Sequence, residues 1–157
     1  MNWSAMFGDE QHRLDVGGRE VRMLLRTPSH PVPHRALLIA LTGDCRGSLD
    51  GAPYRIVPDA FLEAGHSVAS FDLPNHGGLV DHHGAGLAGM AAALADGVDV
   101  FGFIGACGRT VVDAWLSGGL AVAGSVTVAG TSRGGLAALY VMAGDRRVCA
   151  GAAFAPV

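Results

Sequence analysis

The residues with the clearest chemistry are a serine and its glycine-flanked neighbours. Residues 130–134 read Gly-Thr-Ser-Arg-Gly and fit the pattern G-x-S-x-G. In a nucleophile elbow of this pattern the serine lies in a strained turn, and its hydroxyl projects above the edge of a sheet. Gly130, Thr131 and Gly134 shape the turn, since a Cβ at either glycine would collide with the neighbouring strand or helix. The pattern predicts that Ser132 is a nucleophile for acyl transfer.

An elbow requires a strand before the serine and a helix after it. Residues 125–129 form a short run rich in β-branched side chains, which is typical of a strand. Apolar residues recur at helical spacing over residues 136–143, and Gly144 ends that predicted helix. This context favours an elbow over a strand–turn–helix without chemistry, which is the simpler interpretation of the same residues.

The elements before the elbow predict an α/β sheet. Alternating apolar residues over 12–16 and 20–26 flank Gly17-Gly18 and predict an antiparallel hairpin. Continuous apolar runs predict further strands at 36–41, 67–71 and 148–154. Between these runs the sequence predicts a helix at 58–64, and a longer one capped by Asp99 that runs to Ser117 and stops at Gly118-Gly119.

Strands that alternate with helices imply a mostly parallel sheet with right-handed crossovers and helices on both faces. Its sites form at the carboxyl ends of the strands, where residues 42–48, residues 72–78 and Ser132 all fall. Gly102, Gly105 and Gly108 lie inside the longer helix. They predict either a close approach of another backbone or a weak helix start.

Composition sets the protein class. The chain has 157 residues, half of them hydrophobic, which suits one globular domain over residues 1–157. Its net charge is −3, without a basic cluster, so we expect neither nucleic acid nor a membrane as a partner. All eleven cationic residues are arginine, which excludes Schiff-base chemistry and a Walker-type phosphate loop.

Three cysteines lie far apart and match no zinc or disulfide framework, and Cys107 and Cys149 lie in apolar runs typical of buried thiols. Residues 1–10 show no leader pattern, so we expect a cytoplasmic protein. The longest uncharged run, 114–132, divides into a helix end and a strand because glycines interrupt it.

Together these motifs resemble the N-terminal part of an α/β-hydrolase, of the bacterial esterase, dienelactone-hydrolase or prolyl-oligopeptidase-like branches. The residues that carry the resemblance are Thr-Gly-Asp at 42–44, Asp-Leu-Pro-Asn-His-Gly at 72–77 and the elbow. The resemblance implies an eight-stranded sheet with Ser132 as the nucleophile. It also implies an oxyanion hole made by the N–H of Arg133 and a second N–H, from Asp44 or otherwise from Gly43. No cofactor is implied.

The family's acid and histidine follow the serine in sequence, and here no histidine follows Ser132 and Asp145 is the only acid that does. The resemblance therefore predicts a domain cut short after its sixth strand, with its general base and acid elsewhere. We expect a serine hydrolase that acts on a carboxylic ester or amide through an acyl-enzyme. The alternative is an inactive fragment that binds a partner or self-associates through its exposed last strand.

Other histidines offer weaker hypotheses. His76, His82 and His83 follow the predicted strand at 67–71 and are the candidates for a substitute base within the chain, although the resemblance gives His76 a structural role in its loop. Asp81, His82 and His83 carry groups that suit zinc, but a solvated loop is the favoured interpretation, and we predict no metal site. Residues 84–89 match the dinucleotide pattern G-x-G-x-x-G without a preceding strand, so we interpret them as a loop that enters a short helix or lid at 87–95.

Overall fold

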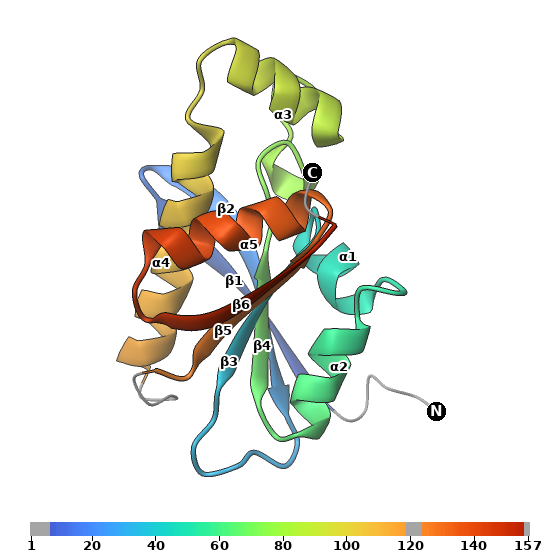
Figure 1. The fold of residues 1–157 in the computed structure, drawn as a ribbon, viewed down its shortest axis with the longest axis vertical. Coiled ribbons are helices and arrows are strands. Elements are labelled where there is room, and N and C mark those ends of the chain that lie inside the picture. Colours follow the sequence, from blue (N-terminus) through green and yellow to red (C-terminus); the bar gives the residue numbers. More distant parts are fainter. Residues whose placement is uncertain (1–6, 119–123, 156–157) are drawn as a thin grey trace.

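One twisted sheet of six strands runs through the computed structural model, which describes residues 7–118 and 124–155 (Figure 1). The strand order is β1-β2-β4-β3-β5-β6. The strands are β1 (Phe7–Val16), β2 (Arg19–Pro28), β3 (Leu37–Leu41), β4 (Ser67–Phe71), β5 (Val126–Thr131) and β6 (Val148–Phe154). β1, β2 and β4 pair antiparallel, while β4, β3, β5 and β6 pair parallel. The predicted hairpin and the mostly parallel sheet are confirmed.

Helices connect the strands on both faces of this sheet. They are α1 (Cys45–Asp50), α2 (Ile56–Glu63), the 3-10 helix η2 (Gly77–Leu79), α3 (Gly86–Ala95), α4 (Val100–Ser117) and α5 (Arg133–Gly144). The predicted helix at 58–64 is α2, the one at 99–117 is α4, and the one at 136–143 is part of α5. α1 was predicted as loop, because its six residues include a glycine and are too few to show a helical period.

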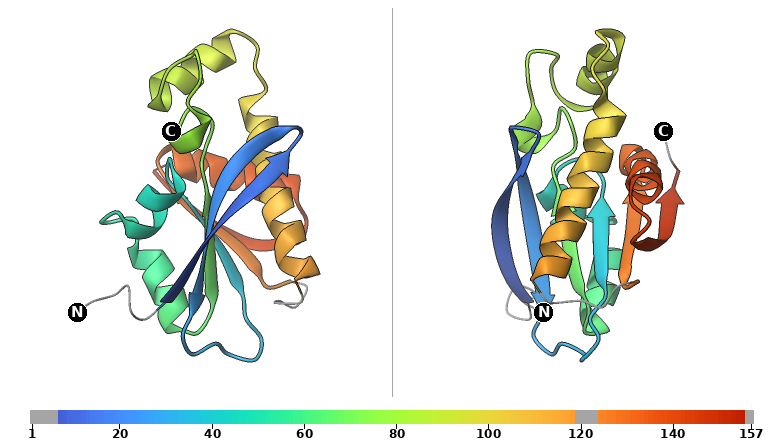
Figure 2. Two further views of the ribbon diagram at one scale, coloured as in Figure 1. Left: turned by 180° about the vertical axis from the view of Figure 1, so that it is seen from behind. Right: turned by 90° about the vertical axis from the view of Figure 1, so that its left-hand side faces the viewer.

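Each face of the sheet carries its own core. On one face α4 and α5 pack with residues such as Ile39, Val128 and Trp115. On the other face α1 and α2 cover a smaller cluster that includes Leu38, Leu49 and Leu62. Figure 2 shows the sheet between these layers, with α3 beyond the edge at which the parallel strands end. That edge is where the elbow and the two predicted loops lie.

The glycines of α4 answer the question that the sequence left open. A side chain at Gly108 would press into Val141 of α5, and Gly105 faces the backbone of Tyr140. Gly102 lies under the capping carboxylate of Asp99, which accepts a hydrogen bond from its N–H at 2.8 Å. The helix is therefore glycine-rich because α5 approaches its backbone closely and because the cap needs room.

Two sequence predictions concern the helix end and the thiols. α4 ends at Ser117 with Gly118 as its cap, whereas Gly119 and residues 1–6 lie outside the described residues. Cys45 and Cys107 are buried, but the prediction for Cys149 was wrong. Cys149 is exposed because β6 is the edge strand of the sheet, and no other described residues cover the outward face of β6.

No described helix alone has the length and apolarity to cross a membrane. Only α3 and α4 taken together pass that test, as a pair bent by 115°.

Candidate active site

Ser132 lies in the turn between β5 and α5. Its φ of 57° and ψ of −127° belong to a region that a residue with a Cβ occupies at a cost of about 1–3 kcal/mol. The Ser132 N–H donates to the carbonyl of Phe154 at 2.9 Å, and the Ser132 carbonyl accepts from Gly135 N–H at 2.8 Å. The hydroxyl does not cap α5. The backbone is that of an elbow, and the helix does not use the hydroxyl.

The two glycines of the elbow are required by their surroundings. A Cβ at Gly130 would overlap the carbonyl oxygen of Gly134, at the start of α5. A Cβ at Gly134 would overlap the carbonyl oxygen of Leu41, at the end of β3. The collisions expected with helix and strand are confirmed, and they show that the turn packs directly against β3.

The loop after β3 carries the second set of predicted oxyanion donors. The Asp44 side chain caps α1 by accepting from Gly47 N–H at 2.9 Å, and the Gly43 carbonyl accepts from Leu73 N–H at 2.8 Å. Across the described ranges, the N–H groups of Gly43 and Asp44 donate to no other backbone or side-chain group. Arg133 is the first residue of α5, so its N–H has no acceptor within the helix. All three predicted donors therefore remain free.

A buried carboxylate, which the sequence places in the 72–77 motif without assigning it a role, ties the two loops together. Asp72 is fully buried. It accepts from Cys45 N–H at 2.9 Å, from Gly78 N–H at 2.7 Å and from Arg22 Nε at 3.1 Å. The loop after β3 and the loop after β4 are thus fixed to one anion. The sequence signal for this role is that Asp72 directly follows an apolar run predicted to be a buried strand. A carboxylate in such a place needs hydrogen-bonded partners, and these would come from neighbouring loops.

His76 lies in the loop after β4, beside the loop after β3. Its Nδ1 is 2.8 Å from the Pro74 carbonyl oxygen, whereas its Nε2 is buried without a hydrogen-bond partner in the described structure. Burial lowers the pKa of His76 below its ordinary value, and the charge of Arg133 acts in the same direction. Since a carbonyl oxygen accepts only, we assign the proton to Nδ1 and the free lone pair to Nε2.

The structure brings Gly43, His76 and Arg133 together. A Cβ at Gly43 would lie 2.8 Å from His76 Cδ2 and 3.5 Å from Arg133 Nε. The absence of a side chain at Gly43 therefore lets His76 and Arg133 pack closely against the loop after β3, next to the elbow.

Two other candidate groups, Asp145 and His83, are engaged elsewhere. Asp145 lies beyond the far end of α5 from Ser132 and binds Arg147, whose hydrogen bond lowers the pKa of that carboxyl. The potential ligand atoms of Asp81, His82 and His83 lie within 4.8 Å of one another. Both nitrogens of His83 already have partners: Nδ1 lies 3.1 Å from Asp81 Oδ1, and Nε2 lies 3.2 Å from Asp96 Oδ2 in the turn after α3.

The dinucleotide pattern at 84–89 serves packing. The segment before it forms one isolated bridge, from Asp81 to Gly84, rather than a strand. α3 begins at Gly86, which confirms the predicted short helix. A Cβ at Gly89 would overlap the carbonyl oxygen of Gly84, so this glycine lets α3 fold back over the turn.

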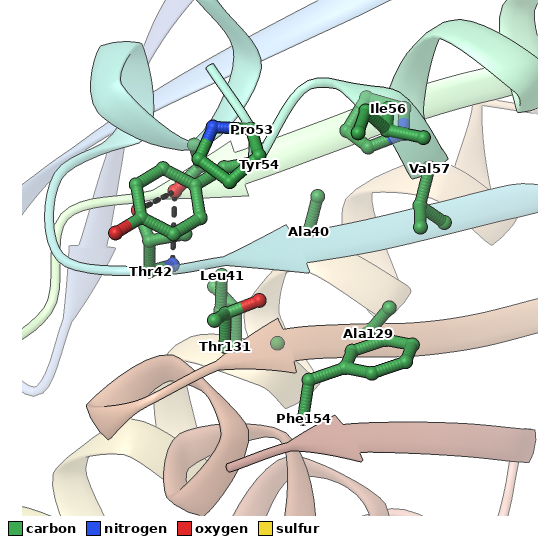
Figure 3. Close-up of a pocket in the computed structure, with 13 residues that line it drawn as sticks. Ala40, Leu41, Thr42, Pro53, Tyr54, Ile56, Val57, Ala129, Thr131 and Phe154 are labelled. Carbon is green, nitrogen blue, oxygen red and sulfur yellow. Dashed lines mark hydrogen bonds between the residues drawn. The ribbon is translucent and has the colours of Figure 1, made fainter. Parts of the chain in front are cut away.

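An apolar pocket of about 220 Å³ lies beside the elbow, on the α1 and α2 face of the sheet. Figure 3 shows Ala40 and Ala129 on its floor, with Ile56 and Phe154 at its sides (Figure 3). Gly130 and Thr131 of the elbow also line it. The small side chains of Ala40 on β3 and Ala129 on β5 leave room for the pocket, and the exposed side chains of Tyr54, Ile56 and Phe154 surround it.

Neither family models nor curated proteins match the chain. Solved structures do. A cold-adapted esterase from an Arctic intertidal metagenomic library matches with a TM-score of 0.72 and 21% identity over 93% of this chain. An acetyl xylan esterase from Paenibacillus sp. R4 matches with a TM-score of 0.67 and 17% identity over 96%. A puromycin hydrolase matches with a TM-score of 0.65 and 20% identity over 96%.

The chain spans 59%, 54% and 22% of those three proteins, respectively. At these identities the likeness shows the fold. The chain has the α/β-hydrolase fold expected from its motifs, and it matches part of the length of its structural neighbours.

Proposed function

We propose that Ser132 is the nucleophile of a serine hydrolase that cleaves a carboxylic ester or amide. The observation that carries the proposal is the strained backbone of Ser132 at the carboxyl end of β5, between two glycines that tolerate no side chain. A non-glycine residue at positive φ persists only where its surroundings hold it, and such positions gather at functional sites. The esterases and the hydrolase with the same fold support this reaction class.

The proposed reaction proceeds through an acyl-enzyme. Ser132 Oγ attacks the carbonyl carbon, its proton passes to a general base, and the leaving alcohol or amine takes that proton. The tetrahedral oxyanion is bound by the Arg133 N–H and by the N–H of Asp44 or Gly43. One such donor contributes about 3–4 kcal/mol to the transition state. Water then cleaves the acyl-enzyme and releases the carboxylic acid.

We place the general base and acid outside the described residues, in a longer chain or a partner chain. The described part offers Ser132 no hydrogen-bonded base, and no histidine follows Ser132 in the sequence. A serine without an adjacent base is a weak nucleophile at neutral pH. A small external base that enters the open site should then activate it.

The test is covalent labelling with a fluorophosphonate, read by intact mass, with and without added imidazole. The Ser132→Ala variant is the control for the labelled residue, and circular dichroism shows that each protein is folded. We expect an adduct that requires Ser132 and forms several-fold faster with imidazole. N-methylimidazole at equal pH and ionic strength checks that the added base acts as a base and not as a salt.

Each outcome separates the hypotheses. An adduct at Ser132 without imidazole supports the hydrolase but contradicts an external base, and single replacements of His76, His82 and His83 then find the base. If a folded protein forms no adduct under either condition, Ser132 is not the nucleophile, and the alternative of an inactive fragment that binds a partner or self-associates is favoured. An adduct that persists in Ser132→Ala also refutes it.

A second candidate function rests on β6. Val148 is buried, but the next four residues are exposed, and β6 pairs only with β5 among the described strands. The strand carries no charge that would discourage pairing. We propose that a second copy pairs antiparallel with this edge. Light scattering should then show a dimer that Ala150→Lys dissociates and that Ala143→Lys, on the exposed side of α5, leaves intact; a monomeric wild-type protein refutes it.

A further inference from the structure

The loop after β4 brings one carboxylate and two imidazoles together, away from the elbow. One potential ligand atom from each of Asp81, His82 and His83 lies within 4.8 Å of the others. Imidazole nitrogens and carboxylate oxygens are ligands that zinc accepts. Neighbouring side chains in an extended chain point to opposite sides, so two adjacent histidines reach one ion only where the backbone turns.

The backbone makes such a turn between Asp81 and Gly84. These two residues form an isolated antiparallel bridge, and the Gly84 N–H donates to the Asp81 carbonyl at 3.0 Å. The buried Asn75 braces the turn, because its Nδ2 donates to Asp81 Oδ1 at 2.9 Å and to the Gly84 carbonyl at 3.0 Å. The rings of His82 and His83 lie against each other in this turn, with their centroids 3.9 Å apart.

The His83 ring is held between two carboxylates. Its side chain is only 7% exposed, with Nδ1 3.1 Å from Asp81 Oδ1 and Nε2 3.2 Å from Asp96 Oδ2. A neutral imidazole has one N–H and one lone pair, so it donates to one of these carboxylates and turns its lone pair toward the other. Only an added proton or a metal ion makes both contacts favourable.

The surroundings of the ring decide which nitrogen suits the ion. A metal-binding histidine usually donates its second N–H to a carboxylate, which fixes the ring. With Nε2–H donating to Asp96, the Nδ1 lone pair points toward Asp81. Asp81 Oδ1 already accepts from Asn75 and from the His83 N–H, whereas no described residue binds its Oδ2. Asp81 therefore keeps one oxygen for a ligand.

We infer that Asp81, His82 and His83 bind one Zn²⁺ ion, and that Asp96 positions the His83 ring from its other nitrogen. Ligands of a tetrahedral zinc ion lie about 3.3 Å apart. Small rotations of the exposed Asp81 and His82 side chains bring the three atoms from within 4.8 Å to that spacing. The sequence predicts no metal site, and the difference lies in the turn that Asn75 holds. The ion ties the loop after β4 to the turn after α3, and the inference involves no residue of the elbow.

Zinc binding is measured by calorimetry on the protein without a histidine tag, near neutral pH. We expect one ion per chain. His82→Ala should weaken binding at least about tenfold, and Asp96→Asn should weaken it about tenfold, the usual loss when a metal-binding histidine loses its carboxylate. His34→Ala is the matched control, because it removes an exposed imidazole between β2 and β3 and should leave binding unchanged. Nitrogen NMR of the zinc-bound protein should show the His83 proton on Nε2.

The outcomes separate a built site from adventitious binding. No binding of zinc, binding that survives His82→Ala, or an equal loss in His34→Ala each overturns the inference. A proton on Nδ1 of zinc-bound His83 overturns the role of Asp96. Because the His82 side chain is exposed, its replacement leaves the fold intact, and circular dichroism checks this. Failure of labelling at Ser132 refutes the proposed function without touching this result.

Discussion

Replacing Asp72 by asparagine should destabilise the protein while barely changing its shape. The carboxylate is fully buried and receives hydrogen bonds on both oxygens. Asparagine has one acceptor oxygen, and its NH₂ group would face either Cys45 N–H or Gly78 N–H. Whichever way the amide turns, one buried N–H loses its acceptor and meets a donor, and the Arg22 guanidinium loses its charged partner.

The size of the effect follows from those contacts. A hydrogen bond to a charged group contributes about 1.5–3 kcal/mol, and a buried donor left unpaired costs about 1–3 kcal/mol. The Arg22 side chain is 35% exposed, so its share is screened by water and adds little. We therefore expect the free energy of unfolding to fall by about 3 kcal/mol, a large part of the about 5–15 kcal/mol typical of a domain.

The measurement is equilibrium unfolding in urea, followed by tryptophan fluorescence and circular dichroism. Asp113→Asn is the control, since it makes the same chemical change in a carboxylate that is 63% exposed and bound to Arg147 at 2.6 Å. An exposed pair contributes about 0–1 kcal/mol. If Asp72→Asn loses less than about 1 kcal/mol, or no more than the control, then Asp72 does not hold the two loops.

Three further predictions test the elbow, a helix cap and the thiols. Gly134→Ala should abolish Ser132 labelling or unfold the chain, because its Cβ would overlap the Leu41 carbonyl; labelling at the wild-type rate contradicts this. Asp99→Ala should cost about 1 kcal/mol in urea unfolding, since Gly102 N–H loses its acceptor. Ellman's reagent should modify Cys149 alone in the native protein, because burial raises the pKa of both other thiols to about 12; rapid reaction of a second thiol contradicts this.

The parts of this fold that could be predicted are those with local signals. The elbow, the Gly17-Gly18 hairpin and the Asp99 cap each depend on residues a few positions apart, and all three have the expected backbone. The parallel part of the sheet could be predicted because buried parallel strands appear in the sequence as uninterrupted apolar runs.

The parts that could not be predicted depend on contacts between distant segments. α1 is six residues long and receives support from Arg26, which donates to its Leu49 carbonyl from β2. The Asp72 anchor joins residues 22, 45, 72 and 78, which no spacing rule connects. Cys149 has an apolar sequence context, but exposure depends on the place of its strand in the sheet.

The two candidate functions share one strand. The strained Ser132 is held by the carbonyl of Phe154, the last residue of β6. Among the described strands β6 is paired on one side only, and edge elements open more easily than central ones. A strand that pairs with the outer edge of β6 would keep Phe154 in place and so stabilise the elbow. We therefore propose that association at this edge would stabilise the backbone of Ser132 through the hydrogen bond to Phe154, so that the two candidate functions would be coupled.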